Sequence, residues 1–197
     1  MAERKHTPNK AEARLLEPFI GLPLSAIVVP STKDEFDAAL AYLQGCKTVG
    51  FDTESKPTFK VGEVSDGPHV VQFATLERAY VFQLLHEECH PVVAAILESR
   101  DIVKVGFGLK SDLAHLHRKL GVDIQATTDL DTMFRARGYR RETGVRSAVA
   151  ILFAQAFQKS KRVTTSNWAL PRLDDRQLLY AANDAYAAIR VFMALGN

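Results

Sequence analysis

Three runs in the first half of the chain predict β-strands, and the last two of them are rich in valine, phenylalanine and tyrosine. They cover residues 48–54, 69–76 and 78–84. The last two runs are joined by a single residue, which leaves room only for a tight reversal, so we expect an antiparallel hairpin. The three consecutive strands would form the start of a central sheet.

Other segments of the chain have the signals of helices. Thr32, with Glu35 three residues later, forms a capping-box signature for a helix that runs towards Gln44 and stops at Gly45. More helices are predicted from Pro91 onwards and over residues 110–120, 146–157 and 174–195, with short strands at 26–29 and 102–107. Residues 127–134 fit either a strand or the start of a helix. This alternation predicts an α/β domain with a mixed central sheet flanked by helices.

The composition is that of one globular domain. With 197 residues, 47% hydrophobic and 24% charged, the chain can bury a core without disulfides or a structural metal. We expect a partly disordered or helical N-terminal tail over residues 1–21 and a folded domain over 22–197. No apolar run approaches the roughly 20 residues of a membrane helix, and the polar, basic start is unlike a signal peptide. These features predict a cytoplasmic protein without a membrane partner, and they leave the oligomeric state open.

The net charge of +2 is small, but basic residues are concentrated in one stretch. Residues 131–162 contain eight basic and two acidic side chains, which gives a local charge of +6. Such a stretch is suited to contact with phosphates, although a solvated basic surface without a partner explains it equally well.

Two acidic residues end a strand that is otherwise apolar. Asp52 and Glu54 are separated by one residue, so on a strand both side chains emerge on the same face. Adjacent carboxylates repel each other unless protons or cations lie between them, and oxygen ligands of this kind suit Mg²⁺ or Mn²⁺. By itself the pair is a weak signal, because chance pairs at a strand end are common.

Two further carboxylates lie on predicted helices later in the chain. Asp112 follows the predicted strand 102–107 and begins a helix, where the helix dipole alone favours an acidic residue. Tyr180 and Asp184 are four residues apart in the last predicted helix and therefore share one face. The apolar neighbours of Asp184 predict a buried helix, so this carboxylate needs a partner, and a cation shared with Asp52 would supply one.

Taken in order, the motifs of the chain resemble those of the DEDD-type 3′–5′ exonucleases, most closely the ribonuclease D and Werner-type branch. The matching segments are residues 49–54, 71–73, 104–106, Asp112, 166–168 and 179–186. The resemblance covers roughly residues 26–195, nearly the whole chain, and its last segment is the most specific.

The resemblance implies a ribonuclease H-like fold and an enzyme that releases nucleoside monophosphates from the 3′ end of DNA or RNA. It also implies two divalent cations, Mg²⁺ or Mn²⁺, as cofactors. In the family pattern Asp52 bridges both cations, Glu54 and Asp184 complete the first site, and Asp112 supports the second. Two cations about 4 Å apart activate water and stabilise the charge that develops on the phosphate and the leaving oxygen.

Tyr180 is implied to orient the attacking water. Other family members have a histidine at the position of Leu179, so the chain resembles the tyrosine (DEDDy) subclass. A phenol is too weak a base near neutral pH to remove the proton, which leaves Tyr180 a positioning role. Trp168 is expected to pack beside the last helix rather than to bind a base.

The contacts to nucleic acid are less well specified. Residues 55–57, Ser-Lys-Pro, stand where Werner-type relatives often have an aromatic residue and a proline, so base stacking is assigned to Phe59 or Phe73 instead. Lys159, Lys161 and Arg162 are predicted to contact the phosphate backbone. The expected partner is a nucleic acid with a free 3′ end, single-stranded at least at that end.

Two other functional classes fit parts of the sequence. A non-catalytic nucleic-acid-binding module on a nuclease scaffold would be expected to lack a carboxylate or the tyrosine, and all five residues are present. His86 and His90 belong to a His-Glu-x-x-His string of the zinc-protease kind. Pro91 disfavours helical geometry at His90, so the two histidines are not expected on one helical face. Cys46 and Cys89 have no metal-ligand spacing.

Overall fold

The computed structural model describes residues 7–58, 62, 65–139 and 142–196. Its centre is a six-stranded sheet with the order β2-β5-β4-β3-β6-β7. The strands are β2 (Ile27–Val28), β3 (Thr48–Glu54), β4 (Val70–Ala74), β5 (Ala79–Gln83), β6 (Val103–Gly106) and β7 (Thr127–Asp129). Each strand predicted between residues 26 and 107 is present, with ends that differ by a few residues.

The sheet is mixed. β4 runs antiparallel to both β3 and β5. β2 pairs in parallel with β5, while β6 and β7 add in parallel beyond β3. The predicted α/β class, with three antiparallel strands followed by parallel additions, is therefore confirmed.

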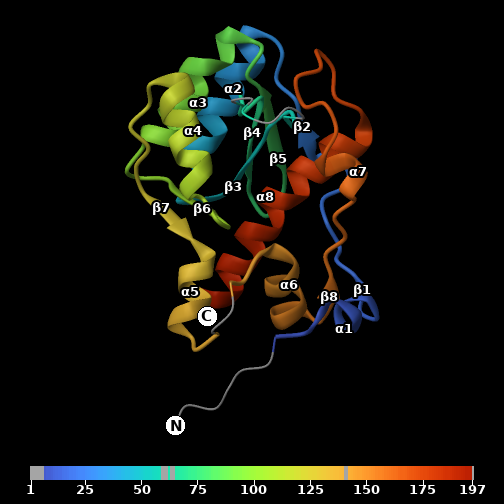
Figure 1. Cartoon of the computed structure of the whole chain (residues 1–197). Helices are drawn as coiled ribbons and strands as arrows, with labels where there is room; N and C mark the ends of the chain where they lie inside the picture. The colour runs from blue at the N-terminus through green and yellow to red at the C-terminus, as the bar shows by residue number, and fades with distance from the viewer. Residues whose placement is uncertain (1–6, 59–61, 63–64, 140–141, 197) are drawn as a thin grey trace.

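Helices α2, α3 and α4 cover one face of the sheet (Figure 1). Their bounds are Lys33–Gln44, His90–Glu98 and Lys110–Leu120. The predicted capping box at Thr32 starts α2, and Gly121 ends α4 in the left-handed conformation with a φ of 69°. Aromatic side chains, among them Phe51, Phe73 and Phe82, fill the core between these helices and the sheet.

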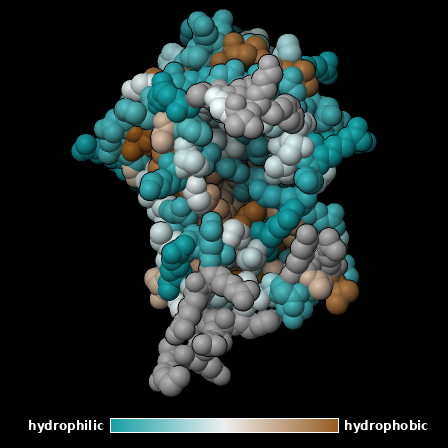
Figure 2. All heavy atoms as spheres, viewed as in Figure 1, coloured by the Kyte–Doolittle hydropathy of each residue, from teal (hydrophilic) through white to brown (hydrophobic). Residues whose placement is uncertain are grey.

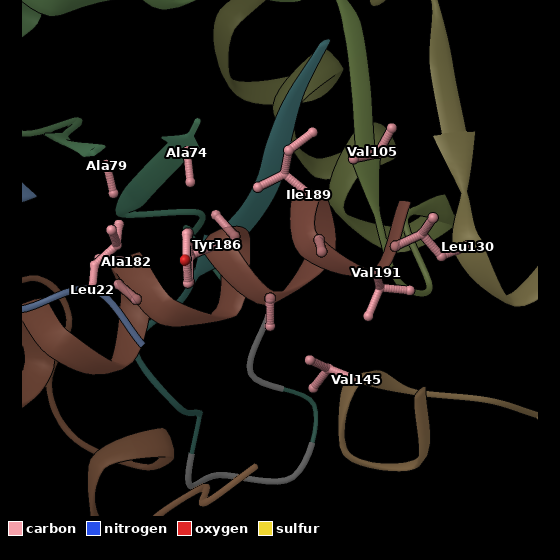
Figure 3. Packing of buried hydrophobic residues seen from close by; sticks show 14 of the residues in the cluster. Leu22, Ala74, Ala79, Val105, Leu130, Val145, Ala182, Tyr186, Ile189 and Val191 are labelled. Atoms are coloured by element: carbon pink, nitrogen blue, oxygen red, sulfur yellow. The ribbon is translucent and has the colours of Figure 1, made fainter. Parts of the chain in front are cut away.

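Helix α8 crosses the opposite face of the sheet, accompanied by α5 and α6 (Figure 1). The bounds are Leu130–Ala136 for α5, Val145–Phe153 for α6 and Asp175–Gly196 for α8. Figure 3 shows Ala182 and Ile189 of α8 in the same buried cluster as Ala74 of the sheet. A Cβ atom on Gly50 of β3 would lie 1.9 Å from the carbonyl oxygen of Ala185. Only glycine permits this approach, which brings the middle of α8 onto β3.

The N-terminal segment packs on the same domain. Its elements are α1 (Lys10–Arg14) and β1 (Glu17–Pro18), and β1 pairs in parallel with β8 (Gln155–Ala156). Phe19 packs against Phe157 and Tyr186. The Leu22 amide donates a 2.6 Å hydrogen bond to the Asn183 side chain on α8. The chain therefore contacts the domain from β1 onwards.

Two predicted segments differ in detail. The helix predicted over 146–157 ends at Phe153, because Ala154 adopts the left-handed conformation with a φ of 50°, and β8 follows. The ambiguous residues 127–134 contain both elements: β7 ends at Asp129, whose side chain accepts a hydrogen bond from the Asp131 amide at the start of α5.

Three short elements complete the described structure. They are the 3₁₀ turns Leu24–Ala26 and Glu87–Cys89 and the helix α7 (Lys161–Thr164). Within the described residues, no helix combines the length and the apolar character that crossing a membrane requires.

Candidate active site

Three carboxylates from two elements converge where α8 crosses β3. Asp52 and Glu54 lie on β3 with the one-residue spacing that places them on one face, and Asp184 lies in the middle of α8. Their oxygen atoms lie within 4.8 Å of one another. Gly50 precedes Asp52 by two residues on the same face of β3, and its lack of a side chain allows α8 to approach. We refer to Asp52, Glu54 and Asp184 as the acidic cluster.

Asp112 lies at the edge of this cluster, in the first turn of α4. The Thr53 hydroxyl donates a 2.5 Å hydrogen bond to its carboxylate. The charge of Asp112 contributes to the raised pKa of Asp52 and Glu54, so it is within electrostatic reach of both. The four predicted carboxylates are thus brought to one place, three in close contact and one beside them.

Burial raises the pKa of each of these carboxylates. Burial and then the charge of Asp184 raise the pKa of Asp52 to about 8. Burial and then the charge of Asp52 raise the pKa of Glu54 to about 9. Burial also raises the pKa of Asp112 and of Asp184. Such a group is stable only when protons or cations neutralise it, and its all-oxygen donor set fits a hard divalent cation.

Lys159 lies against the acidic cluster. Its ammonium nitrogen is 2.7 Å from a carboxylate oxygen of Asp184, and the two side chains are 25% and 2% exposed. Burial acts to lower the pKa of Lys159, but the charges of Asp184 and Asp52 outweigh it and raise this pKa. The ammonium is therefore protonated and serves as the counter-ion of Asp184.

Tyr180 lies one helical turn before Asp184. Its hydroxyl accepts a 2.9 Å hydrogen bond from the Thr164 hydroxyl, and the Trp168 ring packs 5.9 Å from the Tyr180 ring. Burial and then the charge of Asp184 raise the pKa of Tyr180 to about 12. The phenol therefore keeps its proton near neutral pH. The predicted packing role of Trp168 is confirmed, because that side chain is buried.

Asp52 and Asp184 of the acidic cluster line a cleft of about 1320 Å³, together with Phe107, Arg146 and Tyr180. Figure 2 shows a hollow near the middle of the visible face, with apolar atoms (brown) inside it and hydrophilic residues (teal) around it. A cleft of this size can hold a nucleotide.

The residues predicted to contact nucleic acid differ in whether the structure leaves them accessible to a strand. Phe73 has no exposed surface and stacks on Phe51 inside the core, so the prediction that Phe73 stacks on a base is wrong. Phe59 lies outside the described residues. Lys161 and Arg162 are exposed on α7, near the cleft, which suits the predicted backbone contact.

Part of the basic stretch 131–162 is used inside the protein. The Arg135 side chain pairs with Asp131 at 2.6 Å, and the Arg137 side chain donates to the carbonyl oxygen of Leu195. Arg146 donates a 2.7 Å hydrogen bond to the Lys159 carbonyl. The local charge of +6 therefore overstates the basic surface that is free to meet phosphates.

Sequence reasoning did not single out Gln72 as a neighbour of the acidic cluster. This residue lies on β4 directly opposite Asp52, and its side chain is fully buried. A signal was present, because Gln72 is the one polar residue in an otherwise apolar strand.

The His-Glu-x-x-His string does not form a metal site. His86 has an extended backbone, with φ of −87° and ψ of 97°. His90 does have helical dihedrals, contrary to the bias expected from Pro91, and begins α3. Its ring nitrogen Nε2 lies 2.8 Å from the Leu84 carbonyl oxygen. The two histidines therefore do not share a helical face.

Comparison with known proteins identifies the family of the chain. The sequence model of a 3′–5′ exonuclease family matches residues 27–197. The chain belongs to this family. A 3′–5′ exonuclease of Arabidopsis thaliana is 29% identical over 154 residues, which are 77% of this chain and 53% of that protein. The bifunctional 3′–5′ exonuclease/ATP-dependent helicase WRN of Mus musculus is 27% identical over 91% of this chain and 13% of its own length.

A solved nuclease structure has the same fold. Ribonuclease D of Trypanosoma brucei, solved in complex with RNA, superposes with a TM-score of 0.76 at 22% identity over 87% of this chain and 63% of that chain. The predicted ribonuclease H-like class is confirmed. This chain spans about half of the Arabidopsis relative and a small part of the mouse relative. The family is one of nuclease hydrolases.

Proposed function

We propose that the chain is a metal-dependent 3′–5′ exonuclease of the DEDDy subclass that releases nucleoside monophosphates from the 3′ end of DNA or RNA. The observation that carries this proposal is the convergence of Asp52, Glu54 and Asp184 within 4.8 Å, in a cleft of a nuclease-family fold. Burial raises the pKa of all three, so the cluster requires cations or protons.

Two divalent cations, Mg²⁺ or Mn²⁺, would be held by this cluster together with Asp112. Asp52 would contribute to both sites, Glu54 and Asp184 to one, and Asp112 to the other. When bound, such cations lower the pKa of water and stabilise the charges that develop in phosphodiester hydrolysis. The carboxylates themselves hold and space the cations.

Tyr180 would position the attacking water without taking its proton. The pKa of about 12 keeps the phenol protonated, and the hydrogen bond from Thr164 fixes its hydroxyl, which leaves its own O–H to donate to a group in the cleft. A fixed donor of this kind orients a reacting oxygen. Lys161 and Arg162 would contact the phosphates of the preceding nucleotides.

The substrate would be a strand with a free, single-stranded 3′ end. The family match and the name of the RNA-bound ribonuclease D neighbour both support nucleic acid as the substrate class. The proposed residues contact phosphate and cations, which DNA and RNA share, so both are included in the proposal.

Digestion of end-labelled oligonucleotides tests the proposal. Matched single strands of DNA and RNA, labelled at the 5′ end, are incubated with Mg²⁺, Mn²⁺ or a chelator, beside the Asp52→Asn variant. We expect a ladder that shortens from the 3′ end only with metal and only with the unmodified protein. Tight binding of the strand without shortening would contradict the proposal and favour a non-catalytic binding module.

A further inference from the structure

Lys159 has an unusual place for a residue in a basic segment. Its ammonium group contacts Asp184 at 2.7 Å and lies 5.4 Å from the centre of the Tyr180 ring. Its backbone carbonyl is held by Arg146 through a 2.7 Å hydrogen bond. Both ends of the residue are thus fixed against the catalytic cleft, whereas Lys161, two residues later, is exposed.

The Lys159 ammonium and a metal ion in the acidic cluster would both neutralise the same carboxylate, that of Asp184. Asp184 is one of the three carboxylates whose oxygens converge, so an ion held by the cluster would need the same carboxylate that Lys159 now neutralises. A monovalent ammonium and a divalent ion repel each other at ion-pair distances in a partly buried site. Lys159 and a metal ion therefore compete for Asp184.

The displaced side chain would remain in the cleft. Lys159 lines the cleft, its side chain is 25% exposed, and its carbonyl stays anchored by Arg146. A lysine ammonium is a compact charge on a flexible four-carbon stem, so it can change partners without movement of the backbone. The new partner with the matching charge would be a phosphate of the bound strand, because phosphates carry the charge that enters this cleft.

We propose that Lys159 is a partner-switching cation. It neutralises Asp184 in the metal-free protein, leaves Asp184 when divalent ions are bound, and then contacts the phosphate of the 3′-terminal nucleotide. This inference rests on the proposed function, since it assumes metal ions and a nucleic acid strand in the same cleft.

Chemical labelling of the unmodified protein tests the switch directly. Single-hit acetylation of lysines, read by mass spectrometry, is measured without metal, with Mg²⁺, and with Mg²⁺ plus an oligonucleotide whose 3′-terminal linkage resists hydrolysis. We expect low reactivity of Lys159 without metal, an increase of at least roughly fivefold with Mg²⁺, and protection again with the oligonucleotide. Lys161 is the internal control, with a reactivity that does not rise when Mg²⁺ is added.

A variant measures the competition by an independent route. Lys159→Met removes the charge and keeps most of the stem, Lys159→Arg keeps the charge, and Lys161→Met removes an exposed charge nearby. Without nucleic acid, we expect Lys159→Met to bind Mn²⁺ at least roughly tenfold more tightly than the unmodified protein. The other two variants should bind Mn²⁺ like the unmodified protein. At saturating Mn²⁺, Lys159→Met should turn over an oligonucleotide at least roughly tenfold more slowly.

The outcomes separate this inference from the proposed function. If the unmodified protein binds neither Mg²⁺ nor Mn²⁺ in calorimetry, the proposed function and the switch both fail. If it binds metal but the reactivity of Lys159 does not change, only the switch is overturned. Mn²⁺ affinity of Lys159→Met equal to or weaker than that of the unmodified protein would likewise overturn it. The labelling arm needs no variant and gives a result even if Lys159→Met does not fold.

Discussion

Gln72 on β4 lies directly opposite Asp52 on β3, fully buried, and neither its amide nitrogen nor its amide oxygen has a hydrogen-bond partner within the described residues. A buried amide without partners costs stability, because it has lost its hydrogen bonds to water and gained none. Its position beside a proposed metal ligand places this cost at the candidate active site, where local stability is commonly sacrificed.

Replacement of Gln72 by leucine is expected to stabilise the metal-free protein. The substitution removes two unpaired polar groups at nearly constant volume and should add about 1–2 kcal/mol to the free energy of unfolding. For a domain of this size the Tm should rise by roughly 2–8 °C, measured by calorimetry with chelator present.

Gln83 on β5 offers a matched control for that substitution. Its side chain is also buried, but its amide donates a 2.9 Å hydrogen bond to the Leu170 carbonyl. Gln83→Leu should therefore lower the Tm. A Tm that falls equally in both variants would show that Gln72 has partners after all.

Asp52→Asn is expected to abolish turnover and to stabilise the metal-free protein at alkaline pH. The pKa of Asp52 is raised from its ordinary value of 3.8 to about 8, so folding favours the protonated form. The contribution of Asp52 to the free energy of unfolding is fully present below pH 3.8 and is lost as the pH rises to about 8. The unmodified protein should therefore become progressively less stable than Asp52→Asn over this range.

Thermal unfolding at a series of pH values, with chelator present, measures this difference. At pH 9 the variant should be more stable by at least about 1 kcal/mol, or roughly 2–4 °C in Tm. Mg²⁺ should raise the Tm of the unmodified protein and leave that of Asp52→Asn nearly unchanged. A pH-independent difference between the two proteins would argue against the raised pKa.

Tyr180→Phe should slow hydrolysis by roughly 10- to 100-fold with little change in oligonucleotide binding. The pKa of Tyr180 is about 12, so the shape of the pH–rate profile between pH 6 and 9 should not change. Tyr186→Phe on the same helix is the control, because the Tyr186 hydroxyl accepts from Arg190 and not from a residue of the cleft. Equal rates for Tyr180→Phe and the unmodified protein would dismiss the positioning role.

Gly50→Ala should impair both folding stability and metal binding. The added Cβ would lie 1.9 Å from the Ala185 carbonyl oxygen, so α8 must move away from β3 and carry Asp184 away from Asp52. We expect a loss of at least about 2 kcal/mol and at least roughly tenfold weaker Mn²⁺ binding. Gly196→Ala, which meets no atom within 4 Å, should change neither property. Normal Mn²⁺ affinity in Gly50→Ala would show that the cluster does not depend on this close approach.

The sequence alone determined where most helices and strands lie and which carboxylates belong to the candidate site. The one-residue spacing of Asp52 and Glu54 and the four-residue spacing of Tyr180 and Asp184 fix a common face within one strand and one helix, because these periods are properties of the local backbone. The capping box at Thr32 is local in the same sense, and it was predicted correctly. The order of the motifs added the family and, with it, the convergence of segments that are distant in the chain.

Only the tertiary structure decided which side chains of a strand are buried in the core or lie at the site, and which group a long side chain contacts. β4 is buried on both faces, so it shows no alternation of polar and apolar residues, and nothing local could place Phe73 in the core and Gln72 beside Asp52. Lys159 has the composition of a basic surface segment, yet its ammonium reaches Asp184, which is 25 positions later in the chain. Such contacts depend on how α8 packs against its neighbours, and that packing is a property of the whole fold.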